Sequence, residues 1–148
     1  MRASRLKWLL LLIPVSFAIA HFDRAANLSP GHWREASREP VGLAPDPARH
    51  AAAVVQVYAA RAVRWRGYFG VHTWIATKPA DAEVYSVYEV TRWNRRRNGS
   101  MVSVSERAPD GRWYGNAPEL LADLRGTLAE RVIERIDAAL QTCPRRLP

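Results

Sequence analysis

Four short segments in the middle of the chain have the composition of β-strands, and this limits the possible folds most. They are rich in valine, tyrosine, tryptophan and threonine, which suit a pleated, half-buried surface. The segments are residues 51–62, 69–79, 83–93 and 100–106. Alanines leave the first of them also compatible with a helix. The dipeptide Asn98-Gly99 supplies the positive φ angles of a hairpin turn between the last two. We therefore expect an antiparallel sheet.

The hydrophobic period becomes helical in the last third of the chain. Asn116 with Glu119 has the spacing of a capping box, and Thr127 with Glu130 repeats it after Gly126. We expect one or two helices here, packed on one face of the sheet. The predicted fold class is α+β, with three to four mostly antiparallel strands followed by these helices.

The amino terminus has the three parts of an export signal. MRASRLK is basic, residues 8–20 are apolar, and Ala18-Ile19-Ala20 carries the small residues of a cleavage site. At about 1.5 Å per residue the run spans roughly 20 Å, less than the roughly 30 Å hydrocarbon core, which favours cleavage. The alternative is a retained amino-terminal hydrophobic helix that anchors the chain. Both place the remainder in the cell envelope, anchored in the inner membrane or secreted to the periplasm.

The 148 residues suffice for one domain with a single core. We expect residues 1–20 to form the signal or membrane anchor and residues 21–50 an irregular linker, because the latter hold four prolines and no sustained period. Residues 51–148 then form the α+β domain. The anticipated partner is the membrane, contacted through the amino-terminal segment.

Composition excludes several kinds of site. The single cysteine, Cys143, excludes an internal disulfide and a multi-cysteine metal centre. The four histidines lack metal-ligand spacing, and there is no glycine-rich phosphate motif, so we expect no metal and no cofactor. The net charge of +8 is almost entirely arginine. A nucleic-acid partner is not expected, because of the export signal and because no stacking pattern accompanies the arginines.

His72 is the main candidate for a catalytic residue. Strand alternation places it on the same face as Trp74, and Gly70 leaves room for something to approach. The opposite face carries Phe69, Val71, Thr73 and Ile75, and we expect this second face to be the core. A strand-borne imidazole suits general-base chemistry near neutral pH. The alternative is a structural histidine bonded to the backbone.

Three residues on neighbouring strands could orient His72. They are Glu89, Gln56 and Tyr88, of which we take Glu89 and Gln56 as tentative catalytic partners. A nucleophile is harder to identify, because no motif surrounds the serines of residues 100–105 and Cys143 lies far along the chain. Whether the chain is an enzyme stays open at this point.

A second hypothesis is a non-enzymatic binding or structural domain of the envelope. Four arginines at the tip where the last two expected strands are joined would contact anionic lipid head groups or an acidic polymer: Arg92, Arg95, Arg96 and Arg97. The simpler reading of this run is a solvated hairpin tip.

From residue 52 onward the chain resembles a bacterial family, the domain of unknown function 3750. The likeness is carried by VVQVYAARAVRWRGYFGVHTWIATKP, by YEVTRW and by APDGRWYGNAPELLADLRG. The family has no assigned activity, so the resemblance implies no reaction. It implies that relatives continue past residue 148 through an Asn-rich segment, and we expect this chain to be truncated near Thr142. In the longer relatives, a strand histidine is followed later by a small polar nucleophile candidate in the Asn-rich segment. This order is similar to that of circularly permuted papain-like and NlpC/P60-type hydrolases, so the fold here would be an incomplete version of theirs.

Overall fold

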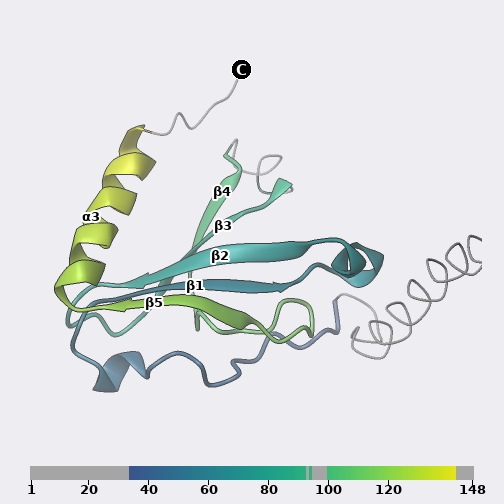
Figure 1. Cartoon of the computed structure of the whole chain (residues 1–148), viewed down its shortest axis with the longest axis horizontal. Coiled ribbons are helices and arrows are strands. Elements are labelled where there is room, and N and C mark those ends of the chain that lie inside the picture. The colour runs from purple at the N-terminus through teal and green to yellow at the C-terminus, as the bar shows by residue number, and fades with distance from the viewer. Residues whose placement is uncertain (1–33, 93, 95–99, 143–148) are drawn as a thin grey trace, which may run out of the picture.

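Residues 34–92, 94 and 100–142 are described by the computed structural model (Figure 1). Five strands form one antiparallel sheet in the order β4-β3-β2-β1-β5. The strands are β1 (Val54–Arg61), β2 (Val71–Lys78), β3 (Ser86–Val90), β4 (Val102–Glu106) and β5 (Glu119–Arg125). One α-helix, α3 (Thr127–Thr142), follows β5, and two short 3-10 turns, η1 (Pro47–Arg49) and η2 (Arg64–Tyr68), lie in the connections.

The α+β class and the four strands expected from composition are confirmed. Each expected segment contains one strand, and the strands pair in chain order, β1 with β2, β2 with β3 and β3 with β4. Three features expected from the sequence lie outside the described residues: the amino-terminal hydrophobic helix, the rest of the signal region, and the turn at Asn98-Gly99. Within the part of the chain that the structure describes, no helix combines the length and apolar character needed to cross a bilayer.

The prediction of a helix after Asn116 was wrong, because residues 119–125 form β5. This strand pairs with the free edge of β1, so backbone hydrogen bonds to a neighbouring strand replace those of a helix. Asn116 does not cap a helix. Its side-chain amide donates to the carbonyl of Arg61 and to that of Trp113, each at 3.3 Å. Local spacing predicted a helix, and pairing with β1 decided otherwise.

The helix expected to begin after Gly126 is present, and the Glu130 amide donates to the Gly126 carbonyl at 3.0 Å in its first turn. α3 begins at Thr127, directly after Gly126, whose φ of 62° suits glycine. α3 packs against β1 and β5, where Ala129 and Ile133 meet Ala53 and Val55. Figure 1 shows the helix at one end of the sheet, running across the strands rather than along them.

The opposite face of the sheet is covered by two loops, residues 37–45 and 107–116, and we call it the loop face. The loops are joined to each other, since Arg112 N donates to the Glu39 carbonyl at 3.1 Å and Gly115 N to the Ser37 carbonyl at 2.9 Å. They are also joined through Asp110, whose carboxylate accepts from Leu43 N at 2.7 Å. The larger cluster of buried side chains lies beneath them: Val54, Tyr58, Ala60, Trp74, Ala76, Tyr85, Val87 and Trp113.

We call the other face, against which α3 packs, the helix face. The expectation that Phe69, Val71 and Ile75 form the core was wrong: they are 74%, 62% and 36% exposed. Trp74, on the loop face, is 2% exposed. The alternation was predicted correctly, but a pattern cannot show which face the loops will cover, and α3 covers only the β1–β5 part of the other.

Candidate active site

His72 and Glu89 meet on the loop face, at the point where β2 and β3 begin to pair. Glu89 lies opposite Trp74 in the register, so His72 is its diagonal neighbour on the same face. His72 Nε2 is 2.9 Å from Glu89 Oε2. Each side chain is 14% exposed, which leaves the pair within reach of solvent.

Two tryptophans fix the plane of the imidazole. The Trp113 ring stacks on it at 3.7 Å between centroids and 16° between planes, and Trp74 lies 5.8 Å away, also stacked. Trp74 is itself held, because its Nε1 donates to the Pro109 carbonyl at 2.7 Å. The strands therefore set the position of the ring, and residues 107–116 set its orientation.

Arg107 is the third charged group of the site. Its guanidinium lies 3.8 Å from Glu89 Oε2 and 6.0 Å from the centre of the Trp74 ring. Burial lowers the pKa of Arg107, although the charge of Glu89 opposes this. Arg107 and His72 thus both lie nearest the same carboxylate oxygen, Oε2.

Glu89 is held as a carboxylate. Burial alone would raise its pKa, but the hydrogen bond from His72 and the charge of Arg107 outweigh burial and bring the pKa below its ordinary value of 4.5. A carboxylate only accepts hydrogen bonds, so Nε2 of His72 must be the donor. In the neutral ring, Nδ1 then carries the lone pair, and among the described residues no group hydrogen-bonds to it.

The other proposed partners of His72 lie elsewhere. Gln56 is fully buried opposite Ala76, and its Oε1 accepts from the Tyr58 hydroxyl at 2.8 Å. Its amide nitrogen finds no acceptor among the described residues. Tyr88 pairs with Ile75 and lies on the helix face. The structure thus brings together His72 and Glu89 and places Gln56 and Tyr88 apart from them.

The arginine cluster is described only in part. Arg92 is exposed just beyond the end of β3. Arg95, Arg96 and Arg97 lie outside the described residues. Among the residues that are described, no three histidine, cysteine, aspartate or glutamate side chains are grouped so as to hold a metal ion.

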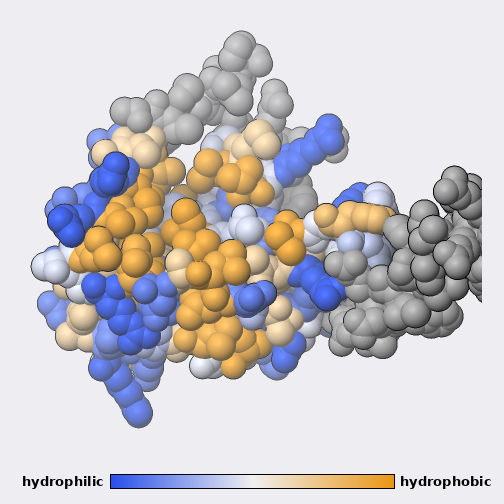
Figure 2. Space-filling view, in the orientation of Figure 1, coloured by the Kyte–Doolittle hydropathy of each residue, from blue (hydrophilic) through white to orange (hydrophobic). Residues whose placement is uncertain are grey.

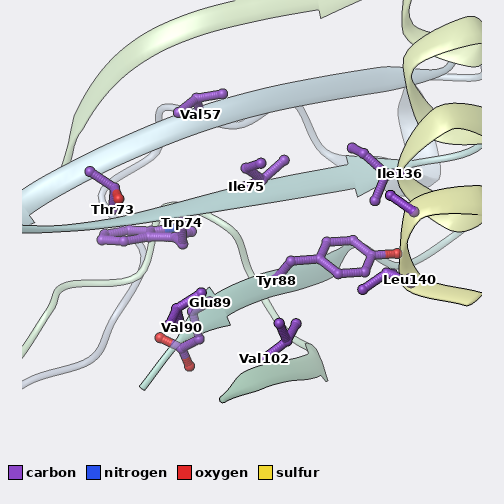
Figure 3. Close-up of a pocket in the computed structure, with 11 residues that line it drawn as sticks. Val57, Thr73, Trp74, Ile75, Tyr88, Glu89, Val90, Val102, Ile136 and Leu140 are labelled. Atoms are coloured by element: carbon purple, nitrogen blue, oxygen red, sulfur yellow. The ribbon is translucent and has the colours of Figure 1, made fainter. Parts of the chain in front are cut away.

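The helix face carries a groove of about 510 Å³ between α3 and the sheet. Figure 2 shows apolar surface gathered beside the helix, with hydrophilic residues around it. In Figure 3, Tyr88 reaches from β3 toward Leu140, and Ile75 stands on the same side of the sheet, whereas the Trp74 ring lies below β2. Trp74 and Glu89 also line the groove, at its end nearest the His72–Glu89 pair.

Sequence reasoning missed Trp113 and Arg107. Both come from the loop around Pro109-Asp110-Gly111, which was recognised as a turn because of its residue types. A turn signal says that the chain reverses there, but not that it folds back over β2. The stacking tryptophan and the second charge could only be found once the loop was placed.

Together these features define an α+β domain with a histidine–carboxylate pair beside two tryptophans on a loop-covered sheet. The chain belongs to the family described as "Protein of unknown function (DUF3750)", whose model matches residues 52–146. The resemblance seen in the sequence is thereby confirmed. Searches of curated proteins and of solved structures find no match.

Proposed function

We propose that this domain is a hydrolase of the cell envelope in which His72 is the general base and Glu89 orients it. The single observation that carries the proposal is the 2.9 Å contact between His72 Nε2 and a Glu89 carboxylate. This contact holds the imidazole in the tautomer that leaves Nδ1 free to accept a proton. The ring is 14% exposed, and within the described part of the chain no main-chain group bonds to it, as one more often does to a purely structural histidine.

The proposed reaction uses water as the nucleophile. His72 Nδ1 takes a proton from a water molecule, and the water oxygen forms a bond to the electrophilic carbon of an acyl ester or amide. The bond between that carbon and the leaving oxygen or nitrogen then breaks. The imidazolium returns the proton to the leaving group, so the histidine ends as it began. Glu89 stabilises the imidazolium while it exists, as a buried carboxylate does behind other catalytic histidines.

Two further considerations support a hydrolase and its location in the cell envelope. The layout of the longer relatives, a strand histidine followed later by an Asn-rich segment, is similar to that of NlpC/P60-type and permuted papain-like hydrolases, although likeness of fold does not by itself fix function. The basic amino terminus and the apolar run that follows, residues 8–20, support export and contact with the inner membrane.

The test is a hydrolysis assay on the purified full chain with a panel of chromogenic acyl esters and amides. We expect turnover above buffer, and we expect His72→Ala to lower kcat/KM by about 100-fold or more. His50→Ala is the matched control, since His50 lies in the loop after η1 and should leave the rate unchanged. Near-ultraviolet circular dichroism confirms that each variant is folded.

Two results would overturn the proposal. One is a folded wild-type protein that hydrolyses none of the panel. The other is a folded His72→Ala variant that keeps the wild-type rate, because the base would then lie elsewhere.

A further inference from the structure

We propose that the groove on the helix face binds the long acyl chain of the substrate, so that the bond to be cleaved reaches the His72–Glu89 pair. This inference rests on the proposed function and adds the class of substrate: an ester or amide of a long-chain fatty acid. It is argued from the lining of the groove, from its charge, and from its continuity with the pair.

Most of the lining is aliphatic. Side chains from four strands and α3 contribute: Val57, Ile75, Val90, Val102, Ile136, Ala139 and Leu140. The volume of about 510 Å³ lies within the range of roughly 300–1,000 Å³ usual for small-molecule sites. An apolar surface of this kind matches a flexible hydrocarbon chain, which needs no hydrogen bonds from its site.

The distribution of charge in the groove also supports a hydrocarbon ligand. Of the described residues that line the groove, Glu89 is the only one with a charged side chain, and it lies at the end near the proposed base. A charged or strongly polar ligand would lose its hydration along the rest of the groove without finding partners. The occupant with the right chemistry is uncharged along its length and carries its reactive group at one end.

The groove reaches the pair where two strands separate. Pairing of β2 with β3 runs from Thr77 to Trp74 and stops at the Trp74–Glu89 position, and beyond it Thr73 and Val90 line the groove. Figure 1 shows β3 and β4 turning away from β2 at this end. His72 precedes Thr73 and projects to the loop face. Glu89 both lines the groove and contacts His72, so a chain end held beside Glu89 lies next to the pair.

Binding is measured separately from catalysis, by displacement of a fluorescent long-chain fatty acid from the full chain in detergent-free buffer. The competitors are saturated fatty acids of increasing length. We expect each added methylene to strengthen binding about fourfold, which corresponds to about 0.8 kcal/mol of buried CH₂. His72→Ala should bind within twofold of wild type, because His72 acts on the bond and not on the chain.

Two variants on α3 locate the site. Leu140→Asp puts a charge into the groove and should weaken binding at least tenfold. Leu128→Asp is the matched control, since Leu128 is exposed near the start of the same helix and does not line the groove, and it should bind like wild type. If Leu140→Asp does not fold, a photoreactive fatty acid replaces it, and we expect cross-links to residues of α3 and β3.

Several results would overturn the inference. They are the absence of binding, affinity that does not depend on chain length, and equal weakening by Leu140→Asp and Leu128→Asp. A wild-type dimer that Leu140→Asp separates, seen by sedimentation, would show a second copy in the groove instead. Chain-length-dependent binding without any hydrolysis would retain the groove and reject the proposed function.

Discussion

The two faces of the sheet differ in what covers them and in what they bury. The loop face carries two tryptophans, two tyrosines and several polar groups, and it is the better buried of the two. The helix face carries mostly aliphatic side chains, and many of them are exposed. Burial here follows from the placement of the loops and not from the hydrophobicity of a strand's two sides.

Several polar groups on the loop face are buried together with a hydrogen-bond partner. Lys78 Nζ donates to the Pro79 carbonyl at 3.1 Å, and the Tyr85 hydroxyl donates to the Pro45 carbonyl at 3.0 Å. Burial also raises the pKa of Tyr85 to about 12. Such bonds are stronger and more directional away from water, so this face can hold a side chain in a defined orientation. The helix face offers apolar contact without orientation.

The largest expected effect compares one side chain from each face of β2. Trp74→Ala removes a ring that is stacked on Tyr58 and bonded to Pro109, and we expect it to lower the free energy of unfolding by about 3–5 kcal/mol. Val71→Ala, on the exposed face, should change it by about 0.5 kcal/mol or less. Urea unfolding followed by fluorescence measures both. Similar losses for the two variants would mean that both faces are buried alike.

A smaller effect is expected from pH. The pKa of Glu89 is lower in the folded chain than its ordinary value of 4.5, so the folded state binds this proton less readily than the unfolded state. The stabilisation from Glu89 is therefore complete above the ordinary value and is lost as the pH falls through the folded value. We expect Glu89→Gln to cost about 1 kcal/mol at neutral pH and progressively less in acid.

Urea midpoints of the wild type and Glu89→Gln, measured from pH 7 down to pH 3, check this expectation. Asp123→Asn is the control, because Asp123 pairs with Arg125 on the outer strand β5, away from His72. A difference between wild type and Glu89→Gln that stays constant with pH would show that Glu89 is not held as a carboxylate by His72 and Arg107.

The sequence predicted what depends on local pattern. The strand compositions, the alternation around His72 and the helical period of residues 127–142 are properties of short segments, and all three were correct. Glu89 was among the proposed partners of His72 because both sit on β-rich segments, although no local rule separates it from Gln56. Register decides between the two: Glu89 lies opposite Trp74, and Gln56 lies opposite Ala76.

What could not be predicted depends on contacts between distant segments. β5 was taken for a helix because its spacing is helical, and only the free edge of β1 makes it a strand. Trp113 lies 41 positions after His72 in the chain, and its stacking depends on the path of the loop that carries it. The groove likewise exists because α3 leaves part of the sheet uncovered, which periodicity cannot show.

The most direct test of the account is nitrogen NMR of the His72 imidazole in the wild type and in Glu89→Gln. Nitrogen chemical shifts report directly which ring nitrogen carries the proton. If Glu89 orients the ring, the neutral imidazole of the wild type carries its proton on Nε2, and this preference weakens in Glu89→Gln. A proton on Nδ1, or the same mixture of tautomers in both proteins, would contradict the assignment of His72 as an oriented base.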